Sequence, residues 1–335
     1  MRLCIFTATG FGCGIAAHMS KEGHSVTVST EWTEGTAIPD ISILDSPIFT
    51  RLADMLRGRG SRVLGPTSWG SLLVSDNGYK QNLISAIGYK PATDTTYGTH
   101  VIVSCWFNGN KFISKSIVFN YTKMMSGDVG TDVDSSGYLV YFNVDKSKLV
   151  REILEPLERF LRKAGHKGCF SVECIVATDK DVYVKDISAD LAKPYTTAIY
   201  ENSKMSKSDI LLSIFNESSA EIRPLDPWVA GVMLSVYPYP QAKPEMIFPI
   251  DGLNPLNIKH SWLMDVENNG DGYQTGELSG NIGYITARGV SPQESCRRVY
   301  RTIENIRAKD LQYRNDVGKG VSEKFYQLQT LGWIL

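Results

Sequence analysis

The chain has 335 residues, of which 42% are hydrophobic and 21% are charged, and its formal net charge is −1. This composition excludes a disordered or fibrous protein, and the length is enough for two or three packed units. A net charge near zero gives no overall attraction to nucleic acid or to an acidic membrane, and no apolar run is long enough to span a bilayer.

The six cysteines show neither C-x-x-C nor Cys/His metal spacing, and several of them lie in apolar, strand-like runs. In such runs cysteine acts as a small hydrophobic residue. We therefore expect a cytoplasmic protein of a reducing compartment, without a disulfide framework.

A glycine-rich turn follows the first predicted strand. Residues 2–8 form an apolar run, a helix comes after the turn, and residues 25–29 form a second strand, which together predict a βαβ unit. Glycines at a helix N-terminus let backbone amides approach a phosphate. Gly10, Gly12 and Gly14 are therefore candidates for a phosphate cradle, and a plain tight turn is the alternative.

The rest of the chain alternates strands and helices. Local patterns predict helices at residues 49–56, 149–164, 205–218 and 291–308, and strands at residues 62–64, 101–107, 112–119, 169–177, 182–187, 230–236 and 282–285. Asn108-Gly109-Asn110 predicts a hairpin turn between two of these strands. Residues 126–137 form a polar stretch, and the apolar tail 325–335 is expected to dock on the protein or to mediate dimerisation.

Four short stretches resemble phosphoribosylamine–glycine ligase (glycinamide ribonucleotide synthetase), a family of ATP-grasp enzymes of purine synthesis. Thr286-Ala287-Arg288-Gly289, after a strand, and the ending from Gln312 to Gly318 match the family's Thr-Ala-x-Gly turn and its Gln-Tyr-Arg-x-Asp-Ile-Gly ending. Asp45-Ser46-Pro47 lies where the family has Glu-x-Pro, and Gly65-Pro66-Thr67 reproduces its Gly-Pro-Thr.

This resemblance implies an α/β, ATP-grasp-like architecture from which the small ATP-binding lobe is deleted. It divides the chain into an N-terminal βαβ domain (1–88), a linker in place of the ATP lid (89–100), a remnant central domain (101–220) and a C-terminal domain (221–335). The linker leaves no room for the lobe, which in the family holds the triphosphate. We therefore expect no ATP as cofactor.

The chain also departs from the family at positions that bind ATP. The family's helix that carries a Ser-Lys pair is expected at residues 72–87, with the pair falling on Asp76-Asn77. The family's Glu-Phe-Asn, which holds magnesium, falls on Asp186-Ile187-Ser188. Its next arginine corresponds to Asp190, and its Asp-Pro-Glu corresponds to Lys193-Pro194-Tyr195. Asp186 with Glu173 remains a candidate pair of magnesium ligands, although a lone carboxylate is a poor magnesium site and two strand-end acids in solvent are the alternative.

The candidate site residues come from these correspondences. The resemblance places a substrate loop at residues 126–137, with a polar surface loop as the alternative, and His260 lies at the family's His-Ala-Gly. Candidate catalytic residues are Asp128, Asp132 and Asp186; candidate substrate-binding residues are Gly10, Gly12, Gly14, Asp45, Gly130, Thr131, Ser188, Lys193, His260, Arg288, Arg314 and Asp316.

Loss of the ATP machinery favours a repurposed enzyme. We expect it to transfer a small amino acid, glycine first, to a phosphorylated nucleotide or modified base that arrives already activated, since amine attack then needs mainly positioning and a base. Phage pathways that attach amino acids to phosphorylated hydroxymethyl-pyrimidines in DNA would need such a transferase, which would lie in the host cytoplasm. The alternatives are an ATP-dependent phosphoribosylamine–glycine ligase and a non-catalytic binding module derived from it.

Overall fold

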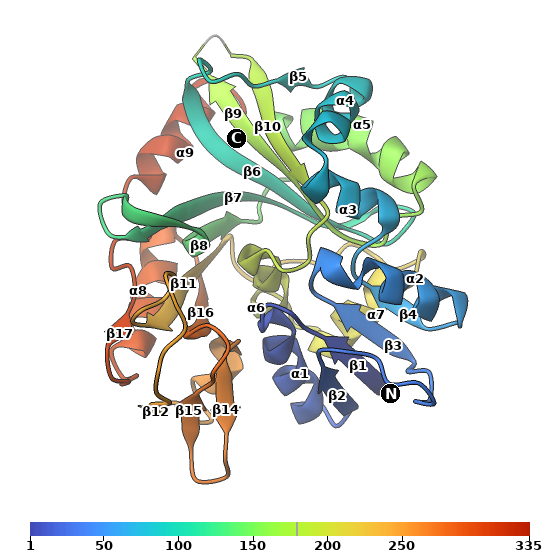
Figure 1. Cartoon of the computed structure of the whole chain (residues 1–335). Helices are drawn as coiled ribbons and strands as arrows, with labels where there is room; N and C mark the ends of the chain where they lie inside the picture. Colours follow the sequence, from blue (N-terminus) through green and yellow to red (C-terminus); the bar gives the residue numbers. More distant parts are fainter. Residues whose placement is uncertain (179) are drawn as a thin grey trace.

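The computed structural model describes residues 1–178 and 180–335. It contains a four-stranded sheet near the N-terminus, a ten-stranded sheet through the middle and a three-stranded sheet at one end (Figure 1). None of the helices within these described residues has the length and hydrophobicity needed to cross a membrane.

The N-terminal sheet is parallel and has the order β2-β1-β3-β4. The strands β1 (Arg2–Phe6), β2 (Ser25–Ser29), β3 (Ile41–Leu44) and β4 (Arg62–Leu64) are joined by the helices α1 (Phe11–Lys21), η1 (Pro47–Phe49) and α2 (Thr50–Gly58). The apolar run of β3 is fully buried, as expected for a strand inside a parallel sheet. The predicted βαβ unit is confirmed.

The helix predicted at residues 72–87 is two helices, α3 (Ser68–Ser75) and α4 (Asn77–Ile87). Asp76 has an extended backbone, and its side chain accepts a hydrogen bond of 2.9 Å from the Tyr79 amide. Aspartate is a strong N-cap, so it starts a new helix here instead of continuing the previous one.

The ten-stranded sheet has the order β13-β16-β11-β8-β7-β6-β9-β10-β5, and β17 pairs with β11. Its strands are β5 (Lys90–Pro91), β6 (Gly98–Phe107), β7 (Phe112–Met125), β8 (Val129–Tyr141), β9 (Gly168–Ala177), β10 (Val182–Ser188), β11 (Trp228–Val236), β13 (Ser261–Leu263), β16 (Asn281–Gly289) and β17 (Leu311–Gln312). Strand β5 is the only regular element between α4 and β6, all of whose residues are described.

The pairing of β8 with β11 makes one sheet from the predicted central and C-terminal domains. The domain boundary near residue 220 stays a prediction, but hydrogen bonds of a continuous sheet cross it. The polar stretch 126–137 also differs from a loop, because β7 and β8 form a long hairpin and only residues 126–128 turn.

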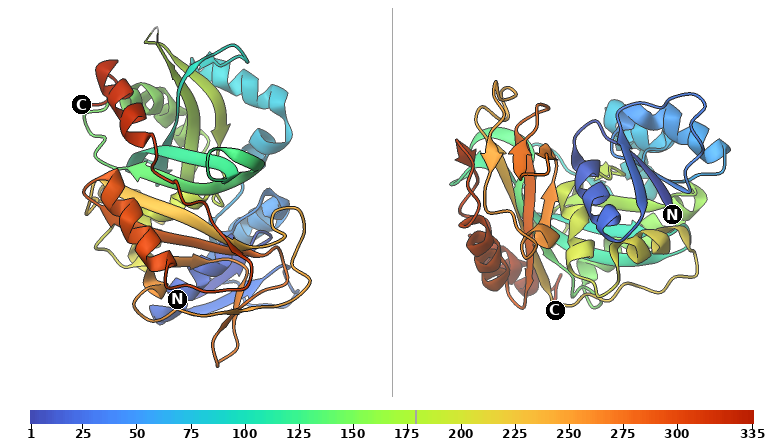
Figure 2. Two further views of the ribbon diagram at one scale, coloured as in Figure 1. Left: turned by 90° about the vertical axis from the view of Figure 1, so that its left-hand side faces the viewer. Right: turned by 90° about the horizontal axis from the view of Figure 1, so that it is seen from below.

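Two cores lie on the two faces of this sheet. One face is covered by α4, α5 (Lys148–Lys163), α8 (Pro292–Ile303) and α9 (Val321–Thr330). The other is covered by the N-terminal sheet with α1, and by η2 (Pro194–Thr197), α6 (Ala198–Glu201) and α7 (Lys207–Phe215). Figure 2 shows the N-terminal sheet and α8 on opposite sides.

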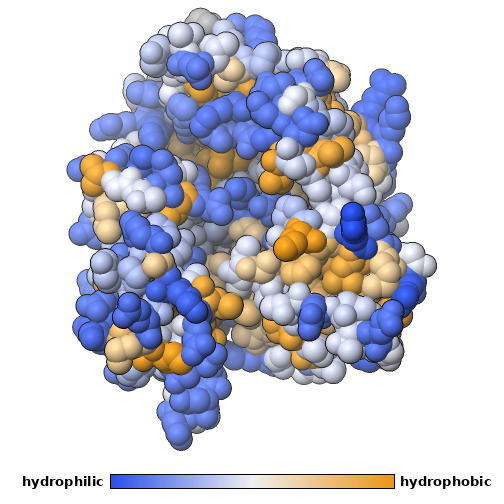
Figure 3. Space-filling view, viewed as in Figure 1, coloured by the Kyte–Doolittle hydropathy of each residue, from blue (hydrophilic) through white to orange (hydrophobic). Residues whose placement is uncertain are grey.

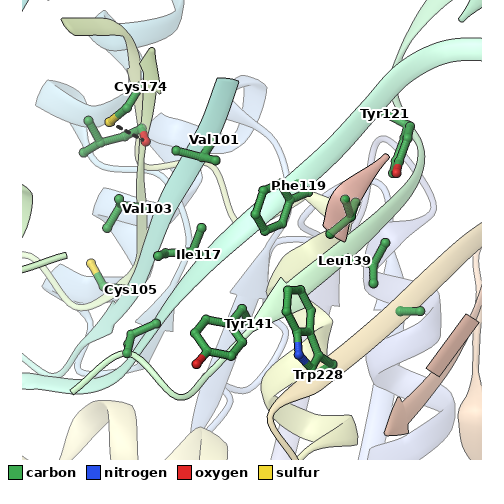
Figure 4. Packing of buried hydrophobic residues seen from close by; sticks show 14 of the residues in the cluster. Val101, Val103, Cys105, Ile117, Phe119, Tyr121, Leu139, Tyr141, Cys174 and Trp228 are labelled. Atoms are coloured by element: carbon green, nitrogen blue, oxygen red, sulfur yellow. Dashed lines mark hydrogen bonds between the residues drawn. The ribbon is translucent and has the colours of Figure 1, made fainter. Parts of the chain in front are cut away.

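Alternating side chains of β6, β7 and β8 build the first core (Figure 4). Val101, Val103, Ile117, Phe119 and Leu139 point into it, which is the period of two expected for strands. The apolar tail docks on the same core, where Trp333 and Ile334 are buried.

The remaining sheet consists of β12 (Pro249–Ile250), β14 (Val266–Asn268) and β15 (Tyr273–Thr275), and η3 (Ile258–His260) precedes β13.

Candidate functional site

A polar cavity with about 540 Å³ of space lies on the second face of the large sheet. It is lined by Ile102, Asn120, Thr122, Val133, Asp134, Ser171, Glu173, Asp186, Ser188, Lys193 and Tyr195. Figure 3 shows hydrophilic side chains in the hollow near the middle of the viewed face. The structure thus brings together three candidates from the sequence, Asp186, Ser188 and Lys193, along with Glu173.

Strand alternation explains why polar groups collect here. In β9, Ser171 and Glu173 line the cavity, while Val172 and Cys174 between and beside them enter the apolar core. In β10 a β-bulge at Lys185 shifts the register. Because Lys185 is an extra residue in the strand, Val184 and Asp186 face opposite sides of the sheet. Val184 and Ile187 therefore face the core, and Asp186 and Ser188 face the cavity.

Each carboxylate of the cavity is paired with a lysine. The Nζ atom of Lys80 lies 2.6 Å from Oδ1 of Asp186, and that of Lys185 lies 2.9 Å from Oε1 of Glu173. Lys193 Nζ lies 3.2 Å from Oδ1 of Asp134. The cavity therefore carries balanced charges of both signs.

Lys80 and Asp134 were missed from the sequence. The family's lysine position falls on Asn77, but Lys80 lies one helical turn further along the same face of α4, which packs against β10. The helical spacing of three residues was the available signal for Lys80. Asp134 was overlooked because the whole stretch was treated as a loop, in which alternation has no meaning.

Burial and neighbouring charges shift the pKa values of Lys193 and Asp190. Burial lowers the pKa of Lys193, but the carboxylates of Asp134 and Asp190 outweigh it, so the net shift is upward and the ammonium is retained. Burial raises the pKa of Asp190, and the carboxylates of Asp134 and Asp45 add to the effect. Asp190 Oδ1 accepts a hydrogen bond of 2.9 Å from the Ala192 amide.

The side chains that line the polar cavity do not form a suitable binding site for a magnesium ion. A magnesium ion needs near-octahedral oxygen ligands, and Asp186 and Glu173 already hold ammonium groups. Among the described residues, no three His, Cys, Asp or Glu side chains are grouped so that they could hold a metal ion.

A second cavity lies at the carboxyl ends of β3 and β4, where open α/β sheets commonly bind ligands. Asp45, Thr67 and Ser71 line it from the N-terminal domain, and Asp190 lines it from the segment after β10. Because Ser188 lines the polar cavity and Asp190 lines this one, the two spaces are separated by a single short segment.

The predicted phosphate cradle is filled by the chain itself. The buried carboxylate of Asp45 accepts hydrogen bonds from the Thr7 hydroxyl, from the Thr9 hydroxyl (3.0 Å) and from the amides of Ala8 and Gly12 (3.0 Å each). An internal anion thus occupies the position at the start of α1 that a phosphate would take.

The glycines of this turn serve close packing. A Cβ atom on Gly10 would lie 3.2 Å from the backbone of Met264, and one on Gly14 would lie 3.1 Å from the Leu263 carbonyl. On Gly12 it would lie 2.5 Å from a side-chain carbon of Ile5. Gly10 also has a φ of 81°, which favours glycine. These contacts support the tight-turn alternative and correct the cradle expectation.

Asp128, Arg314 and Asp316 form one structural cluster at the hairpin turn. The guanidinium of Arg314 is 2% exposed, lies 2.7 Å from Oδ1 of Asp128, and pairs with Asp316. It also donates to the Lys123 carbonyl (3.2 Å) and stacks over the Tyr121 ring. With its donors engaged, Arg314 ties the hairpin to the C-terminal segment and offers no free anion clamp.

Three further candidates on the hairpin, Gly130, Thr131 and Asp132, lie outside the lining of the polar cavity. Asp132 pairs with Lys123 at 2.7 Å, and this hydrogen bond lowers its pKa, which makes it a weaker base. Thr131 accepts a 3.2 Å hydrogen bond from Gln241, and Gly130 lies in the adjoining exposed backbone. None of these three lines the cavity.

His260 and Arg288 lie elsewhere. His260 Nδ1 lies 2.9 Å from Oε1 of the buried Glu201, which also accepts a 3.0 Å hydrogen bond from the Thr286 hydroxyl. Arg288 Nη1 lies 2.7 Å from Oδ2 of Asp226. The two residues belong to neither cavity, so their assignment to substrate binding stays a prediction.

Comparison with known proteins defines the class of fold. No protein-family model matches the chain, and no curated protein matches it either. Solved structures do match over nearly its full length, among them ligases and a carboxylase. The α/β, ATP-grasp-like architecture expected from the sequence is thereby confirmed.

Three of these structures indicate the extent of the likeness. Phosphoribosylamine–glycine ligase from Thermotoga maritima is 16% identical and covers 94% of this chain and 100% of its own, with a TM-score of 0.70. N5-carboxyaminoimidazole ribonucleotide synthetase from the same organism is 10% identical and covers 92% and 99%, with a TM-score of 0.57. Biotin carboxylase from Campylobacter jejuni is 8% identical and covers 99% and 95%, with a TM-score of 0.64. At these identities the likeness extends to the fold alone.

Proposed function

We propose that this protein forms a C–N bond by transferring a small amino acid, glycine first, to a phosphorylated and therefore pre-activated nucleotide or modified base, without ATP. The observation that carries the proposal is the charge-balanced polar cavity, in which Asp134, Glu173 and Asp186 are each paired with a lysine. The ligase-like fold supports C–N bond formation as the general class of reaction.

A lining of alternating charge suits a zwitterion. Lys193 lines the cavity, and its ammonium group could receive the carboxylate of an amino acid, while Lys80 and Lys185 neutralise Asp186 and Glu173 from beside the lining. The carboxylates can receive its ammonium group, as can Oδ1 of Asn120, a buried oxygen with no hydrogen-bond partner among the described residues. A triphosphate carries several negative charges and would meet no net positive charge here.

The acceptor would lie beside the polar cavity, next to Ser188 and Asp190. In the reaction, the amine nitrogen attacks the carbon that bears the phosphate. The C–N bond forms as the C–O bond breaks, and phosphate leaves with the bonding electrons. The proton lost by the amine passes to a carboxylate of the cavity, and Asp134 takes the place of Asp128 and Asp132 as our candidate base because it alone of the three lines the cavity.

The direct test incubates the protein with labelled glycine and a phosphorylated hydroxymethyl-pyrimidine, offered as the free nucleotide and within an oligonucleotide. We expect label incorporation and phosphate release in equal amounts without ATP. Asp134→Asn should lose most of this turnover, while Asp132→Asn, on the same strand but outside the cavity, should retain it. Turnover that strictly requires ATP would disprove the proposal.

A second candidate is an ATP-dependent phosphoribosylamine–glycine ligase. The observation that favours it is the full-length fold likeness to the Thermotoga maritima enzyme of that name, at a TM-score of 0.70. It predicts tight binding of an ATP analogue and rescue of a purine-requiring strain. The third candidate, a non-catalytic module, predicts no deep polar pocket between the N-terminal βαβ unit and residues 126–137, and it predicts that substituting Asp128 or Asp132 leaves any phenotype intact.

A further inference from the structure

Glu173 and Asp186 lie directly opposite each other on the antiparallel strands β9 and β10. Side chains at opposite positions of such a pair are close neighbours, and two like charges there destabilise the sheet. In the ATP-grasp-like fold, acids at this position are expected to share a divalent cation. In this chain the two carboxylates need another source of positive charge.

Two lysines supply that charge from two directions. Lys80 reaches Asp186 from α4 and is only 18% exposed, so the helix holds its ammonium group in place. Lys185 reaches Glu173 from the bulge of β10. The bulge matters because it puts Lys185 next to Asp186 without turning Asp186 into the core.

We infer that Lys80 and Lys185 are resident counter-ions that take the place of a divalent cation at the Glu173–Asp186 pair. A metal ion and an ammonium group compete for the same carboxylate oxygens, and a lysine tethered to the fold is present at high local concentration. Removing the lysines should expose a latent divalent-metal site made of two opposed carboxylates.

The test measures binding of Mn²⁺, followed through the spectrum of the free ion, to the full-length protein. The variants are Lys80→Met, Lys185→Met and the double variant, with Lys167→Met as matched control. Lys167 pairs with Glu217 at 2.9 Å away from the cavity, so its removal frees a single exposed carboxylate. We expect the double variant to bind Mn²⁺ at least tenfold more tightly than the wild type, and Lys167→Met to behave like the wild type.

Adding Asp186→Asn to the double variant should abolish the gained affinity. Circular dichroism and the melting temperature verify that each variant is folded, and Lys80→Met alone serves if the double variant is not. The inference is overturned if the wild type binds Mn²⁺ as tightly as the double variant in a manner that depends on Asp186, or if the folded variant gains no affinity. No amino acid or acceptor is needed, so the result is independent of the transfer assay.

Discussion

Asp45 and Asp186 each lie next to a cavity in this ATP-grasp-like fold, but their surroundings differ. Asp45 is 1% exposed, and its carboxylate accepts hydrogen bonds from two hydroxyls and two backbone amides of residues 7–12. The side chain of Asp186 is 41% exposed and is held by one lysine. The first carboxylate is fixed by four donors of one turn, and the second by a single lysine side chain from a neighbouring helix.

This difference distinguishes a carboxylate that is fixed within the fold from one that a ligand could reach. A buried carboxylate with four donors stabilises the turn that brings α1 against β13, and its hydrogen bonds cannot be exchanged without opening the fold. A half-exposed lysine–carboxylate pair costs little to separate, so a ligand can replace either partner. The Asp45 carboxylate is thus part of the scaffold, whereas the side chains of the polar cavity are accessible to a ligand.

The largest expected effect is on stability at Asp45. Asp45→Ala leaves the donors of Thr7, Ala8, Thr9 and Gly12 without their acceptor, and we expect the free energy of unfolding to fall by about 3 kcal/mol. Urea denaturation measures this loss. As a control, Asp54→Ala removes an exposed partner of Arg57 and should change stability by less than about 1 kcal/mol. An Asp45→Ala protein that is as stable as the wild type would contradict the structural role assigned to Asp45.

The second effect is a dependence of the free energy of unfolding on pH, which His18 causes at the contact between α1 and β13. Burial lowers the pKa of His18 from 6.5 to about 3, while its Nε2 lies 3.1 Å from the Ser261 carbonyl oxygen. The unfolded chain binds a proton below pH 6.5 that the folded protein does not take up. This contribution to stability is therefore complete above the ordinary pKa and is lost as the pH falls towards 3, by about 1.4 kcal/mol per pH unit.

Urea denaturation at pH 7.5, 5.5 and 4.5 should show this loss in the wild type. His18→Gln should flatten the dependence by the same amount per pH unit, because glutamine does not titrate. An identical pH dependence in both proteins would show that His18 is not buried as a neutral side chain.

The smallest effect on stability is expected in the polar cavity. Asp186→Asn breaks a partly exposed pair with Lys80, so the free energy of unfolding should change by less than about 1 kcal/mol. Turnover in the transfer assay should nevertheless fall by about tenfold or more, since the variant disturbs the charge balance where the amino acid would bind. A loss of stability without a loss of turnover would place Asp186 in the scaffold with Asp45.

Several elements were predictable from local patterns, but most strand partners were not. The Asn108-Gly109 turn, the amphipathic helix at 149–164 and the first βαβ unit all have strong local signals, and the structure confirms them. The single helix expected at 72–87 was wrong because Asp76 caps a new helix. The loop expected at 126–137 was wrong because alternation in β8 was hidden by its glycines and aspartates.

The candidate site was less predictable. Asp186, Ser188 and Lys193 were chosen because they correspond to positions of the resembled family, and they do line one cavity. Arg314 and Asp128 were chosen from the family's C-terminal ending and its substrate loop, yet burial and mutual pairing turned them into a structural cluster. Charge signs are visible in a sequence, but exposure and partners are not.

The sequence by itself determined the order of the elements, the apolar faces of the strands and the absence of space for a lobe at residues 89–100. These features depend on local periodicity and chain length. Only the tertiary structure decided that Asp45 fills the glycine turn and that Lys80 reaches Asp186, because each contact joins elements that are distant along the chain. A charge acquires its role from the donors, acceptors and burial around it, and these are set when the layers pack together.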